Sequence, residues 1–151
     1  MKSRDFFAFF RRHKAYGVLF LRLAMGVFLI YGVQDNILSW ERMLEFRDFL
    51  QVHGVPFPLV AAHLSVYTQF LVGLMLLLGC GVRLAGLLLI INFTAAIIIV
   101  HIGQSFPQYY PAAELLCAGF FYLFNGAGPV SVDGYWSSRK HQIQKQDVCV
   151  N

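Results

Sequence analysis

Long apolar blocks dominate this sequence, and their length restricts the fold more than any other feature. A helix needs about 20 mostly apolar residues to cross a hydrocarbon core roughly 30 Å thick. Four blocks reach or approach that length: Tyr16–Val33, Leu59–Leu78, Leu84–Ile102 and Ala112–Gly126. Only 13% of the residues are charged, which is about half the fraction in a typical soluble domain. The sequence therefore predicts an all-α fold, an integral membrane four-helix bundle with spans at 16–33, 59–78, 84–102 and 112–126.

Basic residues cluster near both ends of the chain. They are Lys2, Arg4, Arg11, Arg12 and Lys14 before the first span, and Arg139, Lys140 and Lys145 after the last. Arg83 lies in the short link between the second and third spans, whereas the loop Phe106–Pro111 has no basic residue. The positive-inside rule then predicts cytoplasmic termini, with residues 1–15 as a basic, aromatic interfacial segment and 127–151 as a polar tail. The net charge of +4 is explained by anionic lipid headgroups, so nucleic acid is not an expected partner.

The first outer loop is predicted to contain an additional amphipathic helix. Its apolar residues recur at helical spacing; they are Trp40, Met43, Leu44, Phe46, Phe49 and Leu50. Ser39 can cap the start, Gly54 favours a left-handed stop, and Pro56 prevents continuation. We therefore expect a helix over Trp40–His53 (residues 40–53) that lies on the outer membrane surface or covers the end of the bundle. A gating lid is the alternative to an ordinary surface helix.

Polar residues inside membrane spans are energetically expensive and therefore informative about function. Counting along each span at about 1.5 Å per residue places six of them in the outer third. They are Tyr31, Gln34, Asp35, His63, His101 and Glu114. If they face inward they form one polar crevice open to the outside; otherwise they are polar groups at a wet membrane surface. His101 and Glu114 flank one short loop at matching depth, so we expect them to be neighbours that can exchange protons.

Three further polar residues lie deeper in the spans. Gln69 and Asn92 fall near the midplane, where an interhelical hydrogen bond or a substrate contact would explain each. Arg22 falls in the inner leaflet, where its side chain either extends to the headgroups or has an inward structural partner. A metal site is not supported, because the sequence has neither H-x-x-x-H nor E-x-x-H spacing.

The cysteines do not form a redox motif. The chain contains Cys80, Cys117 and Cys149, with no C-x-x-C pair. No two of them share the outer side of the predicted membrane topology, where a disulfide could form. We therefore interpret all three as free thiols.

Several of these pieces occur together in a fixed order. They are LRLAMGVFLIYGVQ (21–34), GVPFP, GLMLLLGCGVRLAGLLL, the His101/Gly103 pair, Glu114 and the exit GAGPVSVD (126–133). With this order and spacing, the chain resembles the DoxX family of small four-span bacterial inner-membrane proteins over about Leu19–Asp133. Two positions depart from the family pattern: Gln69 stands where an acidic residue is expected, and Tyr31 where relatives often have histidine.

The resemblance implies a multi-pass protein of the bacterial inner membrane that is an accessory or quinone-interacting subunit of a membrane redox system. His101 and Glu114 would then handle the protons of the quinone, and another subunit the electrons. The alternative is a non-enzymatic carrier or assembly factor for a small molecule, modified peptide or metal; a structural membrane protein without a ligand is the second alternative. The sequence shows no complete catalytic or cofactor-binding motif, so we expect at most a subunit of an oxidoreductase complex. Expected partners are the lipid bilayer, a redox or biosynthetic protein, and a second copy in a homo-oligomer.

Overall fold

The regular elements are all helical in the part of the chain that the structure, a computed structural model, describes: residues 7–8, 13–102 and 105–139. In chain order the helices are α2 (Lys14–Leu38), α3 (Trp40–Val52), α4 (Pro58–Leu78), α5 (Val82–Ala96), the π-helix η1 (Ile97–His101) that continues α5, and α6 (Phe106–Asn125). Residues 132–139 form a further short helix. The predicted all-α class is confirmed.

Three helical stretches are long and apolar enough to cross a membrane. They are Ala15–Leu38, Pro58–Leu78 and Val82–Val100. By length and composition they make the chain an integral membrane protein. Helix α6 has 20 residues but is not among these three stretches.

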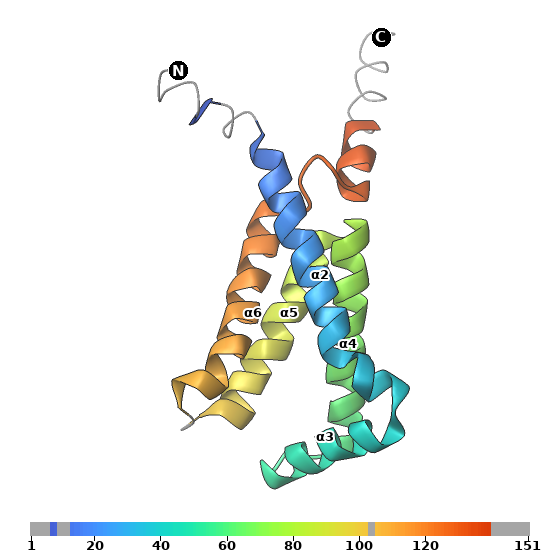
Figure 1. The fold of residues 1–151 in the computed structure, drawn as a ribbon, viewed down its shortest axis with the longest axis vertical. Coiled ribbons are helices and arrows are strands. Elements are labelled where there is room, and N and C mark those ends of the chain that lie inside the picture. Colours follow the sequence, from blue (N-terminus) through green and yellow to red (C-terminus); the bar gives the residue numbers. More distant parts are fainter. Residues whose placement is uncertain (1–6, 9–12, 103–104, 140–151) are drawn as a thin grey trace, which may run out of the picture.

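The long helices pack in two pairs, α2 against α4 and α5 against α6, with α4 and α5 connecting the pairs (Figure 1). Glycines set the distance between the two helices of each pair. A methyl group on Gly86 of α5 would lie 2.6 Å from the carbonyl oxygen of Gly119 of α6. In the other pair, a methyl group on Gly26 would lie 2.9 Å from the carbonyl oxygen of Gly73. Small residues at such contacts let membrane helices approach closely.

Helix α3 crosses the end of the molecule that is opposite to the start of α2 (Figure 1). The Oγ of Ser39 accepts a hydrogen bond from the backbone N–H of Arg42 and so caps the helix. The helix buries Met43 and Leu50 against α4 and its neighbours. The helix starts at the predicted residue, Trp40, and ends at Val52, one residue before the predicted end. The predicted position of this helix is confirmed.

Helix α6 begins earlier than the predicted fourth span, and the expectation of a loop over Phe106–Pro111 is wrong. Ser105 and Gln108 form a capping box, in which the Ser105 N–H donates to the Gln108 Oε1 at 3.1 Å. Pro107 lies in the first turn, where its missing N–H costs nothing. Residues 106–111 therefore extend the helix by six residues toward the α5–α6 loop.

Candidate functional site

Arg22 is the only charged residue buried within the described part of the chain, with 2% of its surface exposed. Its Nη1 donates to the carbonyl oxygen of Ala127 at 2.6 Å, and its Nη2 to that of Val130 at 3.0 Å. The interpretation that the side chain extends to the headgroups is therefore wrong. Arg22 has an inward structural partner instead, because the segment after α6 folds back onto α2 and is not a free tail.

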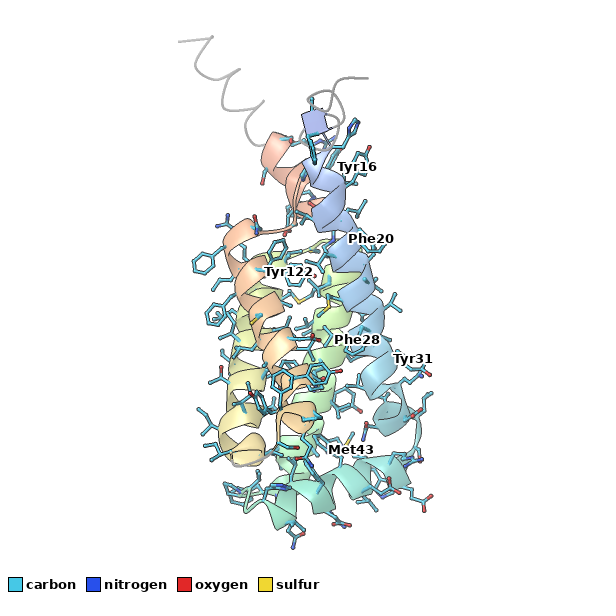
Figure 2. All side chains as sticks on the ribbon, turned by 60° about the vertical axis from the view of Figure 1, so that its left-hand side comes forward. Tyr16, Phe20, Phe28, Tyr31, Met43 and Tyr122 are labelled. Carbon is cyan, nitrogen blue, oxygen red and sulfur yellow. The ribbon has the colours of Figure 1, made fainter. Side chains whose placement is uncertain are left out.

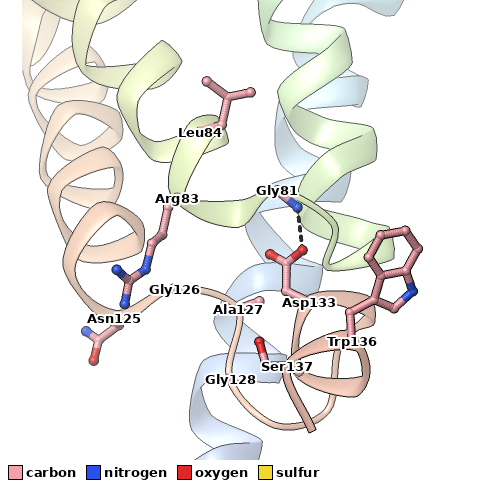
Figure 3. A pocket seen from close by; sticks show the side chains of 11 residues that line it. Gly81, Arg83, Leu84, Asn125, Gly126, Ala127, Gly128, Asp133, Trp136 and Ser137 are labelled. Carbon is pink, nitrogen blue, oxygen red and sulfur yellow. Dashed lines mark hydrogen bonds between the residues drawn. The ribbon is translucent and has the colours of Figure 1, made fainter. Parts of the chain in front are cut away.

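Asp133 completes this fold-back by joining it to the turn between α4 and α5. One carboxylate oxygen accepts from the backbone N–H of Gly81 at 2.8 Å (Figure 3), and the other accepts from that of Val82 at 3.0 Å, at the start of α5. Its own N–H donates to the carbonyl of Gly79 at 3.1 Å. We call Arg22, Asp133 and their backbone partners the arginine lock, a structural element that joins α2, the α4–α5 turn and the chain after α6.

A different environment surrounds Gln69 and Asn92, the two residues predicted to lie near the midplane. Both line one cavity of about 490 Å³ between α4 and α5, together with Ser65 and Thr68. Gln69 Nε2 donates to the Oγ of Ser65 at 3.1 Å, within α4. The side chains of Thr68 and Asn92 make no hydrogen bond to any described residue. Four polar side chains thus meet in this α4–α5 cavity, and two of them are free to bind a ligand.

The rest of the cavity wall is apolar. Helix α3 contributes Phe46, Phe49 and Leu50, so it covers one end of the cavity, and the remaining described lining is aliphatic apart from Phe93. None of the described lining residues is ionisable. Pockets of roughly 300–1,000 Å³ with an apolar wall and a few polar groups are typical small-molecule sites.

Glu114 lies elsewhere, in a groove of about 540 Å³ between α2 and α6. This α2–α6 groove is otherwise lined by apolar residues and Cys117, and Phe28 from α2 points into it (Figure 2). Helix α6 contacts α5 where Gly119 lies beside Gly86 and Ile90. From this contact, both Glu114 on α6 and Asn92 on α5 lie about one to one and a half turns closer to the α5–α6 loop. Glu114 is therefore level with Asn92, deeper than counting from a span start at residue 112 indicated.

The other members of the predicted crevice do not line either the α4–α5 cavity or the α2–α6 groove. Tyr31 is 71% exposed (Figure 2), Asp35 is exposed, and Gln34 is partly buried. The Nδ1 of His63 lies 2.8 Å from the carbonyl oxygen of Leu59 in its own helix. The His101 side chain lies outside the described part of the chain, so its pairing with Glu114 stays a prediction.

Cys80 and Cys117 are exposed free thiols, and Cys149 lies outside the described residues. Among those residues no group of three His, Cys, Asp or Glu side chains could hold a metal ion.

Sequence reasoning missed Ser65, Thr68 and the role of Asp133. Ser65, Thr68 and Gln69 follow the spacing i, i+3, i+4, which places them on one helix face, so this part of the cavity could have been recognised. The hydrogen bonds of Asp133 to residues about 50 positions earlier give no comparable local signal.

Comparisons with known proteins identify one family. No curated protein and no solved structure matches the chain. The DoxX family model matches residues 17–102, which is more than half of the chain and includes most of α2 and all of α3, α4, α5 and η1. The polar wall of the α4–α5 cavity lies within the match, as does Arg22. The chain belongs to the DoxX family.

Proposed function

We propose that this protein is an accessory subunit of a membrane redox system that binds a quinone in the α4–α5 cavity. We place it in the bacterial inner membrane as a four-helix bundle whose fourth span is α6, with both termini cytoplasmic and α3 as an amphipathic helix on the outer surface. Two observations support this topology. Helix α6 has the length of a span and packs against α5, and basic residues flank the start of α2 and the end of the chain.

The cavity carries the proposal because its chemistry fits an uncharged ring with two carbonyl groups. A quinone accepts hydrogen bonds at both carbonyls, and Asn92 and Thr68 have donors without a partner among the described residues. The Ser65 hydroxyl accepts from Gln69 and can still donate its own hydrogen. These residues would hold the ring, and the bound quinone would supply two-electron, two-proton chemistry.

The rim of the cavity suits a ligand that arrives from lipid. Leu64 on α4 is 69% exposed and Ile91 on α5 is 59% exposed, although both line the cavity. An apolar tail can therefore continue from the cavity along a surface that itself faces hydrocarbon. A charged or strongly polar substrate would find no complementary charge among the described lining residues.

The protons of a quinone would have to come from outside the cavity, since the described lining has no ionisable residue. We assign this role to His101 and Glu114 of the predicted crevice. Its other members, Gln34, Tyr31, His63 and Asp35, line neither the α4–α5 cavity nor the α2–α6 groove, and we assign them no contact with the ligand. Glu114, level with Asn92, brings a carboxylate to the depth of the cavity from the separate α2–α6 groove. The electrons would come from a redox protein. That partner would bind either one copy of this chain or a homo-oligomer of it.

The same cavity also favours a second candidate function, that of a non-enzymatic carrier for an apolar small molecule. The observation behind it is the lack of ionisable lining residues, because a carrier needs complementary packing but no proton transfer. The two candidates differ in whether the carbonyl groups of the ligand matter for binding.

A titration of the purified full chain in mild detergent separates them, with decylubiquinone and decylbenzene as probes. Quinone binding predicts that decylubiquinone binds at least about fivefold more tightly, because two hydrogen bonds contribute roughly 0.5–1.5 kcal/mol each. Asn92→Leu and Thr68→Val should each remove about three- to tenfold of that affinity, whereas Asn125→Leu, which changes an asparagine outside the cavity, should leave it unchanged. Equal affinity for both probes would favour the carrier, and no saturable binding of either would contradict both.

A further inference from the structure

A second pocket lies at the end of the molecule where the arginine lock sits, far from α3 (Figures 1 and 3). This terminal pocket has a volume of about 460 Å³ and lies between the start of α5, the end of α6 and the helix of residues 132–139. Its polar lining consists of Arg83, Asn125, Asp133, Trp136 and Ser137. It shares no lining residue with the α4–α5 cavity, so it needs an explanation of its own.

Among its described lining residues, the pocket has one cation without a counter-ion in the described chain. The Arg83 guanidinium makes no hydrogen bond or ion pair with any described residue. The carboxylate of the pocket, Asp133, already accepts from the N–H groups of Gly81 and Val82, and the positive end of the α5 dipole offsets its charge. Gly126 leaves room for the cation, because a methyl group there would lie 3.2 Å from the Nε of Arg83.

Further donors line the same pocket. The Asn125 amide and the Ser137 hydroxyl also have no hydrogen-bond partner among the described residues. A guanidinium presents up to five N–H donors in a planar fork that matches the oxygens of phosphate. A pocket with this cation, an amide and a hydroxyl is therefore complementary to an anion with several acceptor oxygens.

The depth of the pocket indicates where such an anion would come from. One membrane-crossing stretch ends at Leu78 and the next begins at Val82, both close to the pocket. The pocket therefore lies where hydrocarbon gives way to headgroups. Leu84 and Trp136 line it and are more than half exposed. Tryptophan is enriched at this depth, and basic pockets between spans bind anionic headgroups.

We infer that the terminal pocket binds the phosphate of an anionic phospholipid, with Arg83 as the cation and with Asn125 and Ser137 as further donors. The acyl chains of the lipid would lie along the exposed apolar surface below Leu84. Free inorganic phosphate has the same anionic chemistry and is the other source that the experiment must separate.

The test uses native mass spectrometry of the full chain purified in detergent, with phosphatidylglycerol and phosphatidylcholine of identical acyl chains as probes. Wild-type protein should retain phosphatidylglycerol preferentially. Arg83→Ala should lower that preference about fivefold, the effect expected for one cation near a lipid headgroup, and Arg83→Lys should lower it less. Excess inorganic phosphate that displaces the lipid would identify the free anion as the ligand, and persistence of the lipid would identify the headgroup.

Arg139→Ala is the matched control, because it removes the same charge from the same end of the molecule. Arg139 packs over the Tyr135 ring and does not line the pocket. An equal loss in Arg139→Ala and Arg83→Ala would show a general surface-charge effect and overturn the inference, as would an unchanged preference in Arg83→Ala. If Arg83→Ala does not fold, Asn125→Leu and Ser137→Ala test the site without a change of charge. Each should lower retention about three- to tenfold, as expected for loss of one hydrogen bond, and unchanged retention in both would overturn the inference.

Discussion

The arginine lock and the α4–α5 cavity both place polar side chains inside an apolar helical protein, but the two regions use them differently. In the lock, the Nη atoms of Arg22 and both carboxylate oxygens of Asp133 have partners in the described chain. In the cavity, Thr68 and Asn92 have none, and the cavity leaves space beside them. Partnered polar groups stabilise the fold, and unpartnered groups beside a cavity are available to a ligand.

Burial shows the same difference. Arg22 is buried to 2% exposure by the segment that binds it, while Asn92 is only partly buried. A buried polar group without a partner costs free energy, so an open site can hold such groups only where solvent, lipid or a ligand reaches them. Substitutions in the lock should therefore lower the stability of the protein, and substitutions in the cavity should lower its affinity for the ligand.

The largest loss of stability is expected for Arg22→Ala. The substitution removes two charge-assisted hydrogen bonds of about 1.5–3 kcal/mol each and leaves the carbonyls of Ala127 and Val130 without a donor. The free energy of unfolding should fall by about 3 kcal/mol or more. Thermal unfolding of the purified protein, followed by circular dichroism, measures this, and a melting temperature equal to that of wild type would show that the lock does not stabilise the fold.

Asp133→Asn should have a smaller effect of the same sign. The amide keeps one acceptor for the N–H groups of Gly81 and Val82 but loses the second acceptor and the negative charge at the start of α5. A loss of about 1–2 kcal/mol is expected, as for other helix N-terminal caps. The same unfolding experiment applies. A loss as large as that of Arg22→Ala would mean that the carboxylate, rather than the guanidinium, dominates the lock.

Glu114→Gln should not destabilise the protein, although it also changes a charged residue of a long helix. Glu114 makes no hydrogen bond or ion pair with a described residue, so no partner is lost. The cost of a carboxylate at the centre of a span, about 2.5–3.5 kcal/mol and less near the surface, would also be relieved. A melting temperature at or above that of wild type is expected; a clear decrease would indicate a structural partner for Glu114, such as His101.

The smallest effect is expected for Tyr122→Phe. The Tyr122 ring is fully buried, but its hydroxyl has no hydrogen-bond partner among the described residues. Removal of the hydroxyl should change the free energy of unfolding by less than about 1 kcal/mol, because no hydrogen bond is broken. A loss close to that of Asp133→Asn would reveal a bound water between this hydroxyl and the Nε of Arg22, which also lacks a partner in the described chain.

Local signals predicted the helices well and the lock poorly. The cap at Ser39 and the stop at Gly54 place α3 to within one residue, because both act within a few positions along the chain. The early start of α6 was missed although its capping-box residues, Ser105 and Gln108, are also local. The acceptors of Arg22 lie 105 and 108 residues away, so the sequence offered only two alternatives for this side chain.

The candidate site could be predicted only in part from the sequence. Counting residues gave Gln69 and Asn92 the same predicted depth, and the structure brings them to one cavity, but the same counting put Glu114 too near the α5–α6 loop. Depth does not determine which way a side chain points around its helix. That direction is why Glu114, level with Asn92, lies in the separate α2–α6 groove, and why Tyr31 lies on the exposed surface of α2.

The most direct test of the difference between the lock and the cavity is the shift in melting temperature that decylubiquinone causes in wild type, Asn92→Leu and Asp133→Asn. A ligand that binds only the folded state raises the melting temperature, and the rise is larger for tighter binding because the stabilisation is RT ln(1 + [L]/Kd). Asn92→Leu should unfold at the wild-type temperature without ligand and gain much less from decylubiquinone. Asp133→Asn should unfold earlier but keep the full ligand-induced shift. The opposite pattern, with Asn92→Leu destabilised and its ligand shift intact, would contradict the assignment of the cavity to binding and of the lock to stability.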